Sequence, residues 1–130
     1  MYGSYTQLLR YQALNRVIRI AKYARCSSDE QKKNGYTISD QLALLDEFSN
    51  DNEFVAVEEY IDEGVSATLE ISKRKALAKM IEDAKAGKFD IIIIKCIDRF
   101  FRSVEEYYEC QKQLRKAGVT WISIEEPDLD

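Results

Sequence analysis

Arginine and serine residues stand out in three polar segments of this chain, and their chemistry suits a phosphate group. The segments are residues 23–31 (YARCSSDEQ), residues 62–74 (DEGVSATLEISKR) and residues 98–102 (DRFFR). Guanidinium groups carry a permanent charge and match phosphate oxygens with paired hydrogen bonds. Several of them together can stabilise the charge of a phosphorane-like transition state. These segments therefore predict a site that acts on phosphate.

The candidate nucleophiles are the two hydroxyls beside Arg25, those of Ser27 and Ser28. A serine is a poor nucleophile unless a base or the local field favours its alkoxide. The activation has to come from the four arginines, which are Arg25, Arg74, Arg99 and Arg102. Asp98 is a candidate for proton transfer. The alternative is that Asp98 organises a structural ion-pair network while the serines only cap their loop.

The absence of histidine removes many kinds of catalytic site. It excludes Ser-His-Asp triads, Cys-His pairs, His-ligated zinc and histidine acid–base catalysis. The three cysteines form no CxxC motif, so we expect reduced thiols without a disulfide framework or a zinc site. No cluster of carboxylates has the spacing expected for magnesium.

Length and charge limit the class of protein further. With 130 residues and 45% hydrophobic content, the chain is long enough for one domain with its own core. Its net charge of −4 argues against binding nucleic acid or an anionic membrane by bulk charge. It shows neither a membrane-spanning apolar run nor a secretory signal, so we expect a soluble, cytoplasmic protein.

Short apolar runs alternate with segments of helical periodicity. Strands are predicted over residues 16–23, 54–61, 91–94 and 119–124. Helices are predicted from the N-cap Thr37, over residues 76–84 before Gly87, and from Ser103 to near Gly118. Residues 50–52 read as a turn, and residues 26–35 and 62–72 as polar loops. The order predicts an α/β fold with a mostly parallel central sheet and helices on both faces.

This topology explains how distant segments could form one site. Each of the three polar segments follows a predicted strand, and the carboxyl ends of parallel strands meet at one edge of the sheet. That edge is where ligands bind in open α/β sheets. We therefore expect the arginines and serines of the three segments to converge there.

The ordered motifs closely resemble the catalytic domain of the serine site-specific recombinases, the resolvase and invertase enzymes. The matching positions are Tyr23, Arg25, Ser27, Ser28 and Gln31, then residues 62–66 and Arg74, then Asp98, Arg99 and Arg102. Their spacing is most similar to the large serine recombinases of phages and mobile elements. The resemblance covers about residues 18 to 127.

The resemblance implies a role for each matching residue. Ser27 would attack a DNA phosphodiester, giving a 5′-phosphoserine link and a free 3′-hydroxyl. The four arginines would hold the scissile phosphate, and Arg99 or Asp98 would transfer a proton to the leaving oxygen. Gln31 would help to order the site, while Ser66 and Ser28 would lie near the bound substrate. The family uses neither a metal nor any other cofactor.

The resemblance also implies partners and a domain organisation. DNA would be the substrate, and the protein would self-associate as a dimer and, in the active complex, as a tetramer that exchanges strands. We assign residues 1–15 to an N-terminal leader and residues 16–130 to the catalytic domain, with the family's C-terminal DNA-binding region absent. Because non-specific DNA affinity comes mainly from neutralising phosphates, we expect this acidic chain alone to be weak or inactive in recombination.

Two other functions fit parts of the sequence. One is a non-catalytic oligomerisation or regulatory module that keeps the same fold. The other is a flavodoxin-like binder of a small molecule or phosphate at the strand ends. The second lacks a glycine-rich phosphate loop, since the five glycines are scattered along the chain.

Overall fold

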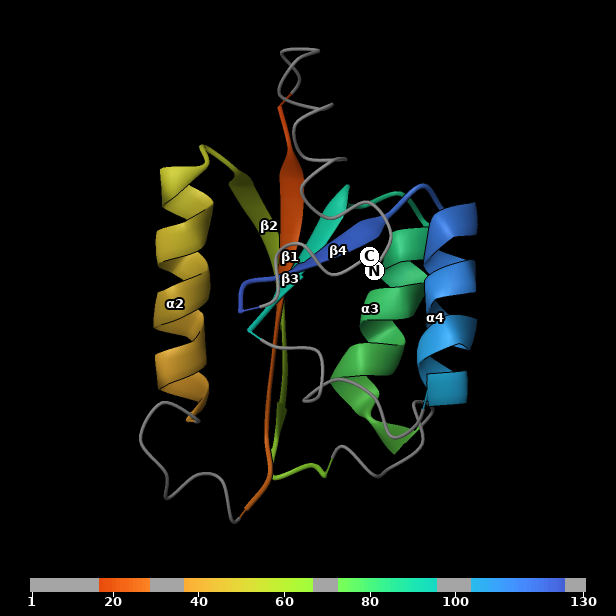
Figure 1. The fold of residues 1–130 in the computed structure, drawn as a ribbon, viewed down its shortest axis with the longest axis horizontal. Helices are drawn as coiled ribbons and strands as arrows, with labels where there is room; N and C mark the ends of the chain where they lie inside the picture. Colours follow the sequence, from red (N-terminus) through yellow and green to blue (C-terminus); the bar gives the residue numbers. More distant parts are fainter. Residues whose placement is uncertain (1–16, 29–36, 67–72, 96–103, 126–130) are drawn as a thin grey trace.

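A four-stranded parallel sheet forms the centre of the molecule (Figure 1). The structure is a computed structural model, and it describes residues 17–28, 37–66, 73–95 and 104–125. Its elements, in chain order, are β1 (Arg19–Cys26), α2 (Ile38–Asp51), β2 (Val55–Glu63), α3 (Lys75–Lys85), β3 (Ile91–Ile94), α4 (Val104–Lys116) and β4 (Thr120–Ser123). The strand order is β2-β1-β3-β4, and every pairing is parallel. The predicted α/β class and parallel sheet are confirmed.

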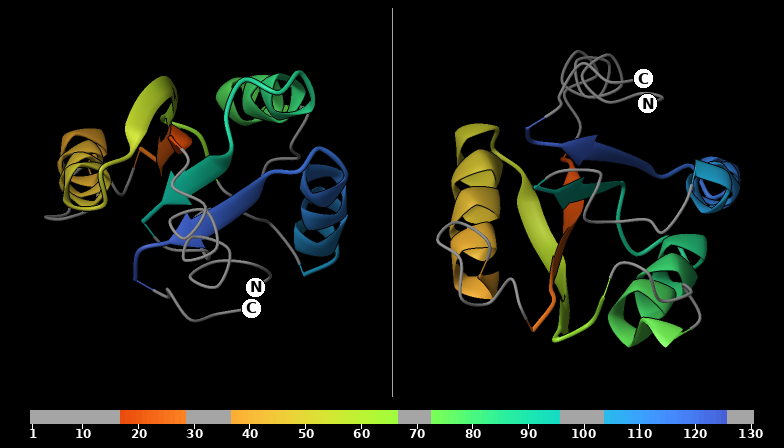
Figure 2. Two further views of the ribbon diagram at one scale, coloured as in Figure 1. Left: turned by 90° about the horizontal axis from the view of Figure 1, so that it is seen from above. Right: turned by 60° about the horizontal axis from the view of Figure 1, so that its bottom comes forward.

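Helices cover both faces of the sheet, as predicted (Figure 2). The four isoleucines of β3 alternate between two cores because successive strand side chains point to opposite faces. Ile91 and Ile93 pack on the α2 side, and Ile92 and Ile94 pack on the side of α3 and α4. All four are buried, which accounts for a strand that is apolar at every position.

Local sequence signals fix several helix ends. The Thr37 hydroxyl accepts a hydrogen bond of 3.1 Å from the backbone N–H of Asp40, so Thr37 is the N-cap predicted for α2. After α3, Gly87 adopts a φ of +76°, the left-handed conformation that commonly ends a helix. Ser103, the predicted start of the helix that became α4, lies outside the described residues.

The predicted boundaries of three elements are wrong. β1 runs over residues 19–26 and β2 reaches residue 63, because the two strands stay paired up to the match of Cys26 with Glu63. Tertiary pairing therefore extends both strands into segments whose polar composition predicted loops. The turn predicted at residues 50–52 is instead the last turn of α2, which ends at Asp51 with Asn52 as its C-cap.

The two adjacent tyrosines of α4 differ in burial, one packing against the core and the other lying at the surface. Tyr107 packs against the core, with its ring centroid 5.4 Å from that of Trp121. Tyr108 is 61% exposed. Phe100 and Phe101 lie outside the described residues, as does the predicted leader, residues 1–15. Within the described part of the chain, no helix is long and apolar enough to cross the membrane.

A buried carboxylate links β2 to α3. The Tyr60 hydroxyl donates a 2.6 Å hydrogen bond to Asp83, whose other oxygen lies 3.3 Å from the ammonium groups of Lys79 and Lys88. The Tyr60 hydrogen bond is the main cause that lowers the pKa of Asp83 below its ordinary value of 3.8, while burial opposes the shift. Because its pKa is lower in the folded state, Asp83 stabilises the fold above pH 4, and this contribution is lost as the pH falls through the acid range.

Tyr60→Phe should lower the free energy of unfolding by about 1 kcal/mol at pH 7, because it removes a hydrogen bond to a buried charge. The difference from wild type should shrink as the pH falls from 7 to 3, because protonation below the ordinary pKa of 3.8 favours the unfolded chain and removes the contribution of the ionised Asp83. Urea denaturation at both pH values measures this. The control Tyr108→Phe, at an exposed position, should change stability by less than about 0.5 kcal/mol. If Tyr60→Phe lowers the free energy of unfolding equally at both pH values, the role assigned to the ionised Asp83 is wrong.

Candidate active site

The carboxyl ends of β1 and β2 meet at one edge of the sheet, where Figure 1 shows both strands running to the bottom of the view. The Cys26 carbonyl accepts hydrogen bonds from the backbone N–H groups of Gly64, at 2.6 Å, and Val65, at 3.2 Å. Ser27 follows directly and is half-buried, while Ser28 is exposed. A Cβ on Gly64, whose φ is +72°, would lie 3.9 Å from Ser28 Oγ. The two serines thus emerge beside the loop that follows β2.

Arg25 is buried at this edge, and hydrogen bonds hold both its guanidinium group and its backbone. Its guanidinium Nη1 donates a 2.7 Å hydrogen bond to the carbonyl of Val65. Its backbone is held by Gln41 of α2, whose amide donates to the Arg25 carbonyl at 2.8 Å and accepts from the Arg25 N–H at 3.3 Å. The loop after β2 therefore fixes the guanidinium group of Arg25, and α2 fixes its backbone.

Arg74 is fully buried at the N-cap of α3. Its Nη2 donates a 2.8 Å hydrogen bond to the hydroxyl of Tyr23, and its guanidinium carbon lies 5.8 Å from the centroid of the Tyr23 ring. The Tyr23 hydroxyl in turn donates to a carboxylate oxygen of Asp62, at 2.8 Å. A chain of two hydrogen bonds thus connects the guanidinium to the carboxylate.

Asp62 also accepts hydrogen bonds from the first turn of α3. Its two carboxylate oxygens accept hydrogen bonds from the backbone N–H groups of Ala76, at 2.9 Å, and Leu77, at 3.1 Å. A carboxylate satisfies N–H groups that a helix leaves without an internal partner in its first turn, and it favours the positive end of the helix dipole. One buried side chain therefore sets both the start of α3 and the place of Arg74.

The two guanidinium groups repel each other at this edge. Burial, followed by the charge of Arg74, lowers the pKa of Arg25, which nonetheless stays protonated at neutral pH. Burial is also the main reason that the pKa of Tyr23 is raised, so its hydroxyl is neutral and can donate to Asp62. An anion that bound here would relieve the repulsion between Arg25 and Arg74.

A depression in the surface adjoins the N-terminus of α3. Its lining includes Lys73 and Lys75, on either side of Arg74, and Asp62, Glu63 and Val65 from the end of β2 and its loop. The two lysines are exposed and extend the positive charge around Arg74 towards solvent. A phosphate backbone longer than one nucleotide could contact them.

The structure brings together five of the predicted site residues, and four lie outside the described part of the chain. The five lie at the ends of β1 and β2 and at the start of α3: Arg25, Ser27, Ser28, Arg74 and Ser66, which follows Val65 in the loop after β2. Gln31, Asp98, Arg99 and Arg102 lie outside the described residues, so their places in the site remain predictions.

Three residues of the site were not among the predicted site residues. Tyr23 and Asp62 belong to the matching motifs but received no role, although they place Arg74. Gln41 was missed entirely. Its signal was available, because it lies one turn before Leu45 on the predicted apolar face of α2, where a buried amide needs hydrogen-bond partners.

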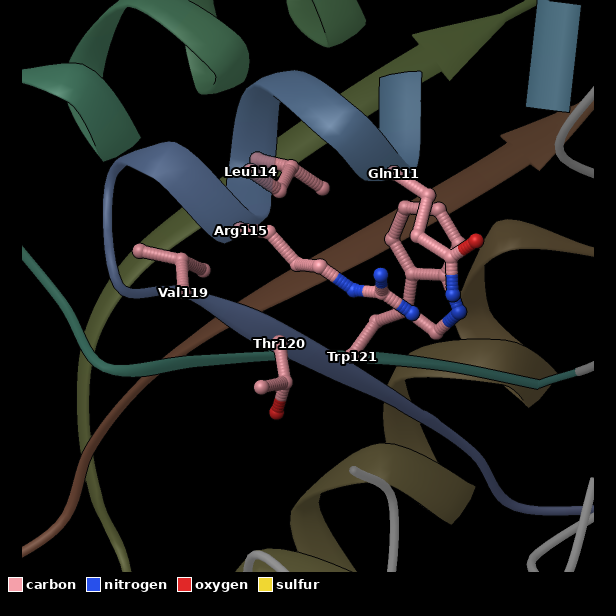
Figure 3. A pocket seen from close by; sticks show the side chains of 6 residues that line it. All are labelled: Gln111, Leu114, Arg115, Val119, Thr120 and Trp121. Carbon is pink, nitrogen blue, oxygen red and sulfur yellow. The ribbon is translucent and has the colours of Figure 1, made fainter. Parts of the chain in front are cut away.

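A second, smaller pocket lies between α4 and β4, away from this edge. Its volume is about 10 Å³, room for a single water molecule. Figure 3 shows the Arg115 side chain lying across it beside Trp121, while the Thr120 hydroxyl points away. It is too small for a substrate. Among the described residues, no three Cys, Asp or Glu side chains gather in a way that could hold a metal ion.

Together with the fold, the sheet edge that carries Arg25, Arg74, Ser27 and Ser28 defines a catalytic domain of the serine recombinase class. The family model described as "Resolvase, N terminal domain" matches residues 20–130, and the chain belongs to that family. Comparison with curated protein sequences gives no match.

Solved structures with the same fold support this assignment. The N-terminal catalytic domain of TP901-1 integrase is 26% identical, with a TM-score of 0.75, over 84% of this chain and 79% of that one. A resolvase family site-specific recombinase from Streptococcus pneumoniae is 27% identical, with a TM-score of 0.71, over 85% and 74%. The C-terminal catalytic domain of ISC1926 TnpA, an IS607-like serine recombinase, is 27% identical, with a TM-score of 0.69, over 82% and 70%.

The hydrogen bonds between Tyr23, Asp62 and Arg74 should appear as an energetic coupling. Tyr23→Phe alone should lower the free energy of unfolding by about 1–3 kcal/mol, because it leaves buried polar groups without their partner. In a double-mutant cycle with Arg74→Met, the two effects should differ from additivity by more than about 0.5 kcal/mol, measured by urea denaturation.

The control cycle pairs Tyr23→Phe with Asp90→Asn, which breaks the ion pair of Asp90 with Arg19 at the opposite end of β1. Those two effects should add, because the sites share no partner. Additivity in the Tyr23–Arg74 cycle contradicts the proposed linkage.

Proposed function

We propose that this chain is the catalytic domain of an enzyme that breaks and rejoins DNA at specific sites, with Ser27 as its nucleophile. The observation that carries the proposal is the placement of two buried guanidinium groups, those of Arg25 and Arg74, at the strand edge from which Ser27 emerges. Buried positive charge in a preorganised site is well suited to stabilising a phosphate that gains negative charge during a reaction.

The reaction divides into bond changes that balance. The Ser27 oxygen forms a bond to phosphorus as the bond from phosphorus to the 3′ oxygen breaks. The Ser27 hydroxyl gives its proton to water or to the Asp98 carboxylate, and the 3′ oxygen gains a proton from a group that we propose is Asp98 or Arg99, which recovers its proton from water, so that no net proton is gained or lost. The products are a 5′-phosphoserine and a free 3′-hydroxyl. Reversal with a different 3′-hydroxyl rejoins the DNA without a metal, a cofactor or nucleotide energy.

The arginines differ in what they contribute. Arg25 is held by the Val65 carbonyl and Arg74 by Tyr23, so both are fixed before DNA binds. We propose that they bind the non-bridging oxygens of the scissile phosphate, together with Arg99 and Arg102. Preorganised donors do not have to be reoriented during the reaction, which is how such groups lower a barrier. Gln31, Ser28 and Ser66 are proposed to support the site around the bound substrate.

Two features support DNA and self-association as partners. The family is one of DNA recombinases, and the matched structures include an integrase and a site-specific recombinase. We propose a dimer that forms a tetramer on DNA, acting on a mobile element in the cytoplasm. Since the chain carries a net charge of −4, we expect its own non-specific affinity for DNA to be low, and the chain alone to cleave weakly or not at all.

Trapping the covalent intermediate tests the proposal. The chain is fused at its carboxyl end to a DNA-binding module of known specificity and incubated with duplexes that flank a randomised centre with that module's sites. The duplexes carry sulfur in place of the 3′ bridging oxygen, so the leaving group needs no proton and rejoining is slow. Wild type should form protein joined to the 5′ end of the break, detected on denaturing gels.

The matched pair of variants is Ser27→Ala and Ser28→Ala, which remove neighbouring hydroxyls. Ser27→Ala should form no adduct, and Ser28→Ala should still form it. Arg74→Ala should slow adduct formation by about 100-fold or more, as expected for a lost transition-state contact. An adduct from Ser27→Ala overturns the assignment of Ser27 as the nucleophile. No adduct from wild type on any sequence overturns the enzymatic function and favours the oligomerisation module.

A further inference from the structure

The outer edge of β2 combines exposed apolar side chains with concentrated negative charge. β2 pairs with β1 on one side, and no other described strand lies beside it. Val55 is 47% exposed, and Val57 and Ile61 are each 39% exposed. Three exposed aliphatic side chains on one edge strand are unusual, because proteins generally blunt such edges to prevent strand addition.

Backbone groups along the second half of β2 point away from the sheet. The Gly64 N–H bonds to the Cys26 carbonyl of β1, and the groups of a strand alternate in direction at successive residues. The N–H and C=O groups of Glu59, Ile61 and Glu63 therefore face outward. They form a ladder to which an extended segment could add as a fifth strand.

Acidic residues predominate along α2 and β2, although Lys73 and Lys75 line the same depression as Ile61 and Glu63 at the carboxyl end of β2. Residues 38–63, which form α2 and β2, contain nine Asp and Glu residues and no Lys or Arg. The whole chain has a net charge of only −4, so the rest of it is positive on balance. Lys22 is the basic residue seen bridging to this region, through ion pairs with Asp46 and Glu59. Exposed carboxylates remain at Glu63 and along α2.

This charge selects among the possible occupants. A second copy of the same edge would place like charges directly opposite one another, which destabilises a strand pair. DNA is a polyanion, so the acidic residues along α2 and β2 would repel it, and it would contact only the carboxyl end of β2, beside Lys73 and Lys75. An extended segment with alternating basic and apolar residues matches all three features of the edge. Its backbone can hydrogen-bond to the outward groups, its apolar side chains can cover the valines and Ile61, and its basic side chains can pair with the carboxylates.

We propose that the outer edge of β2, residues 55–63, is a docking site for an extended cationic segment of another protein, which pairs with it as an added strand. This surface runs along β2 and adjoins the depression beside Arg74 at Ile61 and Glu63.

A short peptide of alternating Lys and Val is the probe, with a matched peptide of alternating Glu and Val and a short DNA duplex as comparisons. Backbone amide shifts of the ¹⁵N-labelled chain locate the binding. The Lys-Val peptide should bind with a Kd below about 1 mM. It should shift the amides of Glu59, Ile61 and Glu63 and slow their hydrogen exchange. Neither comparison probe should do so.

Two charge reversals separate edge pairing from general attraction to acid. Glu63→Lys, on the edge, should weaken binding of the Lys-Val peptide by at least about tenfold. Asp51→Lys, at the end of α2, should weaken binding by less than about threefold, because it acts only through a screened field. The proposal is overturned by no binding of the Lys-Val peptide at 1 mM or by equal binding of the Glu-Val peptide or DNA. It is also overturned by equal loss in both variants, or by shifts confined to α2. None of these outcomes bears on Ser27 chemistry, so the two proposals fail independently.

Discussion

The carboxylate of Asp62 is the group on which the fold and the candidate site both depend. It lies at the end of β2, accepts the first N–H groups of α3 and accepts the hydroxyl of Tyr23 from β1. Tyr23 then holds the buried guanidinium of Arg74. A buried arginine is costly unless hydrogen bonds and opposite charge compensate it. Asp62 supplies that compensation through one intervening hydroxyl, and in the same place it sets the direction of the helix that carries Arg74.

This arrangement explains why the site lies at a strand edge. β1 and β2 remain paired to their last residues, so Arg25 lies opposite Asp62 and the serines follow at once. A site assembled on strand ends and a helix start is more rigid than one assembled on loops alone, and rigid donors are what phosphate chemistry requires. The repulsion between Arg25 and Arg74 is tolerated because Val65, Tyr23 and Gln41 hold the two residues in place.

Much of this could be predicted from the sequence, for identifiable reasons. Ile91–Ile94 read as a central strand because an unbroken apolar run suits a strand covered on both faces, and Thr37 read as a cap because its hydroxyl precedes an apolar helical face. The convergence of Arg25 and Arg74 followed from parallel topology. The ends of β1 and β2 could not be predicted, because pairing between distant strands overrode local polarity. The role of Asp62 could not be predicted from the sequence either, because it depends on how Tyr23 and α3 are placed relative to each other in the fold.

The most direct measurement of the central claim is the identity of the atom that joins protein to DNA. The covalent complex of the fused wild-type chain would be digested with nuclease and protease and analysed by tandem mass spectrometry. We expect a nucleotide phosphate on Ser27, in a peptide where Ser28 is unmodified and supplies an internal comparison. A phosphate on Ser28, Ser66 or a tyrosine would contradict it.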